Sequence, residues 1–412
     1  MTKLQLMLFL TLVTLGFSSC NSTQSASTSE SGSDSGSIKV GVLHSLSGTM
    51  AISETDCKNA TLMAIDEINA AGGLLGKKIE AVVEDGASDW PTFTEKATKL
   101  IDNDAVAAVF GCWTSSSRKA VLPVFESKNN LLFYPVQYEG MEASKNVVYT
   151  GAAPNQQILP AVDYLIGLGK KKFFLVGSDY VFPRTANKII KAKLAKAGVE
   201  LVGEEYAPLG HTEFATMVQK VKASGADAVL NTINGDSNIG FFKQMASNGL
   251  VSPKVVCMSF SIAEVELKGI GVDIMKDQLT AWNYFMSMPG EKNTAFIKAY
   301  QAKYGADKVT DDPIEAAYFG VYLWAEAVKK AGTFETDKVR QAIGGVSYDA
   351  PEGRVTVDPI TNHTIKNFMI GKANAKGQFD IVFKTDTMIK AEPFPALVTT
   401  QKVIAPGNIA AK

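Results

Sequence analysis

The stretch from Gly111 to Gly140 concentrates side chains that can bind a small polar molecule. An apolar run, Ala105–Phe110, stops at Gly111 and is followed by an indole and a row of hydroxyls, and a second apolar run, Leu131–Tyr134, ends in a tyrosine. Hydroxyls and the free N–H groups of a helix N-terminus form hydrogen bonds with a ligand, and they suit a carbonyl or carboxylate oxygen. This stretch therefore predicts binding, because it lacks the base that a catalytic nucleophile needs.

The same pattern recurs later in the chain. Tyr180 follows the expected strand Lys172–Val176, and Asp236 follows Ala228–Ile233. In an open parallel sheet the ligand lies beyond the carboxyl ends of the strands. Each residue also has a simpler interpretation, since small polar residues cap helices and single aromatic residues pack in cores. Their recurrence after strand ends in both halves nevertheless predicts a pocket, with the residues Trp113, Ser115, Ser116, Tyr134, Tyr180, Asp236 and Trp282.

Motifs of the common enzyme classes are absent from the sequence. It contains no G-x-S-x-G elbow, no phosphate-binding G-x-x-x-x-G-K-[ST] loop, and no dinucleotide fingerprint after the first expected strand. Gly235–Ser237 is similar to a hydrolase nucleophile motif, but His363 is the only histidine downstream of it. We therefore expect a protein that is not an enzyme and that needs no cofactor.

Charge and cysteine content exclude further classes of function. The chain has 41 basic and 42 acidic residues, a formal charge of −1, and no basic excess for binding nucleic acid. Cys57, Cys112 and Cys257 are far apart and lack the spacing of a zinc site. We expect them to be buried small hydrophobic residues and expect no metal site.

The first 37 residues predict that the protein is located outside the cytoplasm. Leu4–Phe17 is apolar but too short to span a bilayer, as in a signal peptide. Phe17–Cys20 resembles a bacterial lipobox, whose cysteine becomes lipidated; simple cleavage near Ser19 is the alternative. We expect a signal peptide at 1–19 and, at 20–37, the lipidated Cys20 followed by a Ser-rich tether that anchors the protein to the membrane.

From Ile38 onward, strand and helix patterns alternate in two successive halves. The first half has expected strands at Ile38–Leu43, Ile79–Glu84, Ala105–Phe110 and Leu131–Tyr134. The second has them at Lys172–Val176, Val199–Tyr206, Ala228–Ile233 and Val255–Met258, with a helix at Thr185–Ala197. After the second half, the sequence predicts a strand-like run at Ala281–Ser287, a helix at Glu315–Lys330 and antiparallel strands near the end. The sequence thus predicts an α/β protein with two doubly wound, Rossmann-like lobes.

Several segments together resemble a known family. GCWTSSSRK, LLFYPVQYEG, GSDYVFPR and AWNYF, with the tether and the order of the lobes, are similar to the urea and short-chain-amide receptors of ABC importers. These receptors are type I periplasmic binding proteins, and the resemblance runs from about Ile38 to the end. It implies that Ser115 and Tyr134 contact the amide and that Tyr180 closes over it. Phe182 stands where a related amide sensor has a tyrosine.

The resemblance also implies two lobes joined by a three-crossing hinge, with lobe I at 38–151 and 281–348 and lobe II at 152–280 and 349–412. The crossings are expected near Gly151, Thr280 and Asp349. The implied function is capture of urea or a short amide and its delivery to an ABC permease. Three rivals remain open: a receptor for branched-chain or other amino acids, an amide-sensing regulator, and an amidase.

Overall fold

The computed structural model describes residues 36–399. The predicted signal peptide, Cys20 and nearly all of the tether lie outside the described residues. Within 36–399, no helix is both long enough and apolar enough to cross a bilayer.

The first sheet has five parallel strands in the order β2-β1-β3-β4-β5. They are β1 (Ile38–His44), β2 (Ile79–Asp85), β3 (Val109–Gly111), β4 (Leu132–Tyr134) and β5 (Val147–Tyr149). The order reverses between β1 and β3, which is where open α/β sheets bind ligands. Gly111 is needed at this point, because a Cβ there would lie 2.0 Å from the Leu43 carbonyl oxygen.

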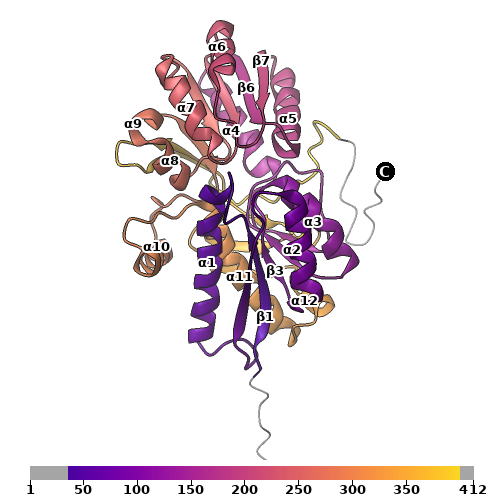
Figure 1. Cartoon of the computed structure of the whole chain (residues 1–412). Coiled ribbons are helices and arrows are strands. Elements are labelled where there is room, and N and C mark those ends of the chain that lie inside the picture. Colours follow the sequence, from indigo (N-terminus) through magenta and orange to yellow (C-terminus); the bar gives the residue numbers. More distant parts are fainter. Residues whose placement is uncertain (1–35, 400–412) are drawn as a thin grey trace, which may run out of the picture. The chain divides into compact units, whose positions relative to one another are not determined.

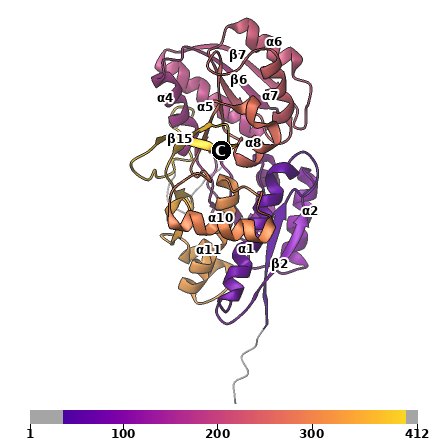
Figure 2. The same cartoon turned by 90° about the vertical axis from the view of Figure 1, so that its left-hand side faces the viewer.

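Helices cover both faces of this sheet (Figure 1). On one face α1 (Ala51–Ala70) packs against α11 (Asp312–Ala331), and on the other α2 (Trp90–Asp102) packs against α3 (Ser115–Ser127). Strands β3, β4 and β5 and most of β1 are buried on both sides, as expected inside a parallel sheet, whereas the edge strand β2 is largely half-buried or exposed. Figure 2 shows α10 (Glu291–Tyr304) beside α1.

The second sheet has seven strands in the order β15-β14-β10-β9-β8-β6-β7. The strands are β6 (Lys172–Ser178), β7 (Glu200–Ala207), β8 (Ala228–Thr232), β9 (Val256–Ser259), β10 (Leu279–Trp282), β14 (Met369–Ala373) and β15 (Phe379–Lys384). Strands β6 to β10 are parallel, and β14 and β15 add an antiparallel edge. This order reverses between β6 and β8, so Tyr180 and Asp236 follow the two strands of the switch point.

The remaining helices and a small sheet complete the fold. The helices are the 3₁₀ turn η1 (Pro154–Gln156), α4 (Ile158–Gly167), α5 (Val181–Ala197), α6 (Ala215–Ser224), α7 (Ser237–Ser247), α8 (Glu264–Ile270), α9 (Val272–Met275) and α12 (Thr336–Ala342). The small antiparallel sheet has the order β11 (Ser347–Ala350), β12 (Gly353–Val357), β13 (Thr364–Ile365), and His363 bridges it to Tyr149 of β5.

The predicted α/β class with parallel sheets is confirmed, but some predicted bounds are wrong. The third strand begins at Val109 instead of Ala105, whose φ of 52° does not fit a strand. Helix α5 begins at Val181, four residues before the predicted Thr185, because Pro183 fits the first turn of a helix. The strand predicted at Ala281–Ser287 ends at Trp282.

The chain passes between the two large sheets at three places, and one buried group of charges contacts all three. Lys366 donates from Nζ to the Thr150 carbonyl at 3.0 Å, just after β5, and pairs with Glu352 at 3.1 Å. Asp312 accepts from the backbone N–H groups of Asn283 and Tyr284, just after β10. The third passage contains Lys366 itself, between β13 and β14. The expected crossing near Asp349 lies within β11, and the lobe bounds stay a prediction.

Lys366 and its carboxylate neighbours are fully removed from water. Lys366, Asp312 and Glu315 have no exposed surface, and Glu352 has almost none. Burial raises the pKa of Glu352 to about 7, against the opposing effect of Lys366, and burial also raises the pKa of Asp312 and Glu315. The folded protein therefore holds protons here that the unfolded chain releases above about pH 4.5. Stability is lost as the pH rises through the interval from about 4.5 to 7.

We predict that Lys366→Met lowers the free energy of unfolding by about 3–5 kcal/mol at pH 8, because it leaves buried carboxylates without their cation. The loss should shrink at pH 5.5, where the carboxyl groups can be protonated. Equilibrium unfolding with guanidinium chloride at pH 8 and at pH 5.5 measures both effects. Lys376→Met, at an exposed turn, is the control and should change stability by less than about 0.5 kcal/mol. An equal loss at both pH values would contradict this electrostatic account.

Candidate ligand-binding site

Helix α3 presents its N-terminus at the switch point of the first sheet. Thr114 caps the helix, since its side chain accepts from the Ser117 N–H at 3.0 Å. The N–H groups of Ser115 and Ser116, in the first turn, have no intrahelical acceptor. Cys112, with a φ of 65°, turns the chain between β3 and this helix. The arrangement gives two backbone donors beyond the strand ends, as predicted.

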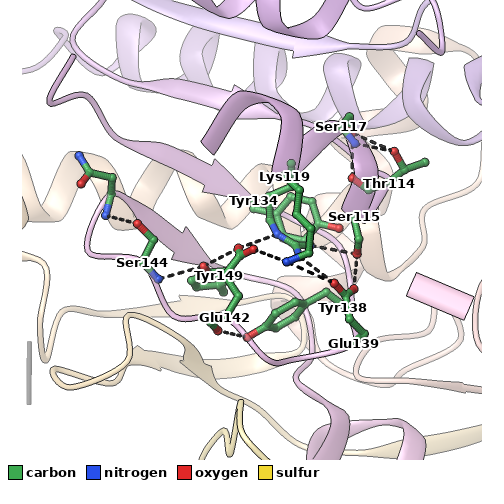
Figure 3. Close-up of polar contacts among 12 residues, drawn as sticks. Thr114, Ser115, Ser117, Lys119, Tyr134, Tyr138, Glu139, Glu142, Ser144 and Tyr149 are labelled. Carbon is green, nitrogen blue, oxygen red and sulfur yellow. Dashed lines mark hydrogen bonds and ion pairs between the residues drawn. The ribbon is translucent and has the colours of Figure 1, made fainter. Parts of the chain in front are cut away.

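A buried polar network that includes Ser115, Glu139 and Glu142 surrounds the start of this helix (Figure 3), and Arg118 is its hub. Its Nε donates to Glu142 at 2.8 Å, its Nη1 to the Ser115 hydroxyl at 3.0 Å, and its Nη2 to Glu139 at 3.2 Å. The guanidinium also lies over the ring of Tyr134, at 4.8 Å, and over that of Tyr138, at 4.7 Å. Such contacts fix the loop after β4 against α3.

Two acidic residues neutralise Arg118 from different directions. Glu139 accepts from the Ser115 hydroxyl, whereas Glu142 accepts from Lys119 at 2.9 Å and from the Tyr149 hydroxyl at 2.8 Å. Burial alone raises the pKa of Glu142, but Arg118 and Lys119 outweigh it and lower that pKa to about 2. Glu142 is therefore ionised at physiological pH, and Arg118 has no charge left unpaired.

Tyr134 is fully buried and has its hydroxyl proton in use. Its hydroxyl donates to the Trp113 carbonyl oxygen at 2.5 Å. Burial raises the pKa of Tyr134, so the phenol is neutral at physiological pH. A hydroxyl with its only proton committed can still accept hydrogen bonds from a ligand.

Trp113 supplies a donor without an acceptor. Its side chain is 2% exposed, and its indole N–H has no hydrogen-bond partner within residues 36–399. Glu54 Oε1 and Gln137 Oε1 are buried acceptors that also lack partners among these residues. Buried polar atoms without protein partners are uncommon in native proteins, and each such atom can take a hydrogen bond from or to water or a ligand.

The second sheet brings Tyr180 to this region. Tyr180 precedes α5, which lies against α3, and its side chain is half-buried. Burial raises the pKa of Tyr180, and the nearby Tyr134 and Glu139 raise it further. Its hydroxyl has no hydrogen-bond partner in the described part of the chain. Tyr180 therefore lies near Tyr134 and Glu139, and its role as a ligand contact with Ser115 and Tyr134 stays a prediction.

Asp236 and Trp282 take other positions. Asp236 is exposed and accepts from the Thr49 hydroxyl, while its backbone N–H donates to the Thr49 carbonyl at 3.3 Å. It therefore links the loops of the two sheets. Trp282 is buried at the end of β10, and its indole N–H donates to the Ile262 carbonyl at 2.7 Å. Trp282 has no polar group free for a ligand. Ser116, by contrast, is half-buried at the start of α3.

Sequence reasoning missed the charged residues of the site: Arg118, Glu139 and Glu142. Arg118 directly follows the hydroxyl row and Glu139 directly follows Tyr138, so both were inside the segments already singled out. Charged residues in such segments are usually solvated. The signal available was their position on the helix and loop that border the predicted pocket.

The three cysteines are free and buried, as predicted. Burial raises the pKa of Cys112, so its thiol is protonated beside the site. In the described part of the chain, no group of His, Cys, Asp and Glu is arranged to hold a metal ion.

Comparison with known proteins agrees with this architecture. The family model described as "Periplasmic binding protein domain" matches residues 38–400. Leu/Ile/Val-binding protein homolog 6 of Brucella melitensis is 25% identical over 342 residues, which cover 81% of this chain and 86% of that protein.

Solved structures show the same fold. A solute-binding protein of an ABC transporter from R. palustris, in complex with 4-hydroxybenzoate, has a TM-score of 0.76 and 25% identity, and the match covers 87% of this chain and 98% of that chain. An amino acid ABC transporter substrate-binding protein from Pseudomonas fluorescens Pf-5 has a TM-score of 0.75 at 20% identity, over 87% and 97% of the two chains. The chain therefore belongs to the periplasmic binding protein domain family and is a type I solute-binding receptor of the ABC-transporter class.

Proposed function

We propose that this receptor captures urea or a short-chain amide and delivers it to an ABC permease. The observation that carries the proposal is the polarity of the buried site. Trp113 offers an unpartnered N–H, while Tyr134 has its hydroxyl proton committed and offers lone pairs. Urea is small, planar and neutral, with one strong acceptor and two NH₂ groups, so it matches a site that has both donors and acceptors.

The oxygen of urea would lie at the donor side of the site. The Trp113 indole and the first N–H groups of α3 at Ser115 and Ser116 are the donors there. The positive end of the helix dipole adds to this attraction. The ring of Tyr180 can then cover the planar ligand from the second sheet.

A ligand with a carboxylate is the alternative, because the relatives' names include amino acids and a benzoate. Such a ligand needs positive charge, or more donors than acceptors, when it leaves water. Within residues 36–399 the fully buried Lys and Arg side chains are Arg118 and Lys366, and both are paired with carboxylates. The unpartnered carboxylate oxygen of Glu54 would also repel an anion. These features favour a neutral ligand.

Contacts between the loops of the two sheets support a clamp around the ligand. Ser53 of α1 donates to Glu266 of α8 at 2.6 Å. Gln137 Nε2, in the loop after β4, donates to the Phe260 carbonyl at 2.6 Å. With the Thr49–Asp236 link, these bonds join segments that follow the strands of one sheet to segments that follow the strands of the other. We assign them to the closed receptor, in which lobes at 38–151 with 281–348 and 152–280 with 349–412 meet over the ligand.

Calorimetric titration of the purified protein should give binding of urea and acetamide and none of leucine or 4-hydroxybenzoate. A limit of about −1.5 kcal/mol per heavy atom gives urea about −6 kcal/mol, which is a Kd of roughly tens of micromolar. Heat with leucine or 4-hydroxybenzoate and none with either amide would contradict the proposal.

Trp113→Phe should weaken urea binding about tenfold, because it removes the unpartnered indole N–H that would bind the urea oxygen. Titration calorimetry measures this change. Trp324→Phe is the matched control, since Trp324 is a buried tryptophan of α11 in the core. We expect the control to lower thermal stability and leave the affinity within about threefold. A stronger effect on affinity from the control would argue against a ligand contact at Trp113.

We also propose that lipidated Cys20 tethers the mature protein to the outer side of the cytoplasmic membrane. A tether keeps a captured ligand near the permease, because it raises the effective concentration of the receptor there. Cys20→Ser should move the protein from the membrane fraction to the soluble fraction after export. Unchanged fractionation would exclude a lipid anchor at this residue.

A further inference from the structure

Ser115, the proposed ligand contact at the start of α3, has hydrogen bonds in two directions inside the protein. Its hydroxyl donates to Glu139 Oε2 and accepts from Arg118 Nη1 at 3.0 Å. All three side chains are essentially buried. An ionised carboxylate only accepts and a guanidinium only donates, so the direction of both bonds is fixed.

The orientation of the Ser115 hydroxyl follows from these two bonds. A hydroxyl has one proton and two lone pairs. Glu139 takes the proton and Arg118 takes one lone pair, which leaves one lone pair for a ligand. Ser115 Oγ can therefore accept from a ligand N–H but cannot donate to a ligand oxygen. This reverses the donor role that hydroxyls at this position were expected to have.

We propose that Glu139, held in place by Arg118, is a positioning residue that makes Ser115 a hydrogen-bond acceptor and so selects ligands with an N–H group. The inference rests on the proposed function, in which Ser115 contacts the amide. It assigns Glu139 a part in specificity, although Glu139 acts through Ser115 and not on the ligand. The Tyr134 hydroxyl is likewise only an acceptor toward a ligand, because its proton is committed to the Trp113 carbonyl.

Glu142 provides a matched comparison. Both carboxylates bind Arg118, but only Glu139 accepts from Ser115; the partners of Glu142 are Arg118, Lys119 and Tyr149. Glu139→Gln and Glu142→Gln each remove one negative charge, and in both cases it is the charge of a carboxylate paired with the Arg118 guanidinium. In Glu139→Gln the amide oxygen must face Arg118, so its NH₂ group faces Ser115 and donates to it. The Ser115 proton is then free to point at the ligand.

The test uses acetamide and acetate, which have the same shape and differ in NH₂ against O⁻. We expect the wild-type protein to bind acetamide at least about a hundredfold more tightly, because a site built for N–H donors rejects an analogue that lacks them. Glu139→Gln should reduce this ratio at least about tenfold, whereas Glu142→Gln should leave it within about threefold. Calorimetry gives the affinities, and thermal melts confirm that each variant is folded.

Ser115→Ala keeps the inference testable if Glu139→Gln does not fold. It removes the acceptor, so acetamide binding should weaken at least about tenfold while acetate binding stays the same or improves. The inference is overturned if the two glutamate variants change the ratio equally, which would mean that charge alone matters. Equal weakening of both ligands by Ser115→Ala would overturn it too.

Failure of the proposed function is visible in the wild-type protein alone. If that protein binds leucine and no amide, the same variants are titrated with leucine and its 2-hydroxy analogue, which lacks the ammonium. Loss of preference for leucine in Glu139→Gln but not in Glu142→Gln would then uphold the role of Glu139. Wild-type binding of benzoates alone, which have no N–H group, would contradict both proposals.

Discussion

The buried ammonium group of Lys366 is the constraint on which the arrangement of the chain depends. An ammonium without water is tolerated only where oxygen atoms replace its hydration. Here they come from the Thr150 carbonyl and Glu352, on segments far apart in the sequence. Glu315 and Asp312 extend the group, because Glu315 accepts from the Glu352 N–H at 3.0 Å and Asp312 holds the segment after β10. One charge cluster thereby fixes the passages between the two sheets.

Arg118 is a second buried cation with a different task. Its partners lie on α3 and on the loop after β4, so it joins the two segments that carry the candidate ligand contacts. Its charge is consumed by Glu139 and Glu142, and the site is left without free positive charge. The same carboxylates that make burial of the guanidinium possible also orient the hydroxyl beside them. Stability and ligand preference are therefore coupled at this point, because the carboxylates that compensate the buried guanidinium include the one that orients Ser115.

The sequence was most informative where the hydrophobic periodicity of a segment agrees with the helix- and strand-ending residues at its two ends. The strands and helices of both halves follow from apolar runs ended by Gly, Pro and small polar residues, and the predicted sites at strand ends follow from the rule for open sheets. The direction of individual hydrogen bonds could not be predicted in this way. Whether the Ser115 hydroxyl donates or accepts depends on Arg118 and Glu139 meeting it in space, and Trp282 is indistinguishable in sequence from a ligand contact until its N–H is seen to bind Ile262.

Binding of the small neutral ligand proposed above places a particular demand on the hydrogen-bonding groups of the site. Small neutral ligands have little surface to bury, so most of the affinity must come from hydrogen bonds that water would otherwise make. Such bonds add to affinity only if the protein groups are already oriented and unable to pair with one another. Thr114 at the helix cap, the Trp113 carbonyl under Tyr134, and Glu139 beside Ser115 each fix one of those groups in advance. The internal hydrogen bonds that occupy these residues thus prepare the remaining donors and lone pairs for a ligand.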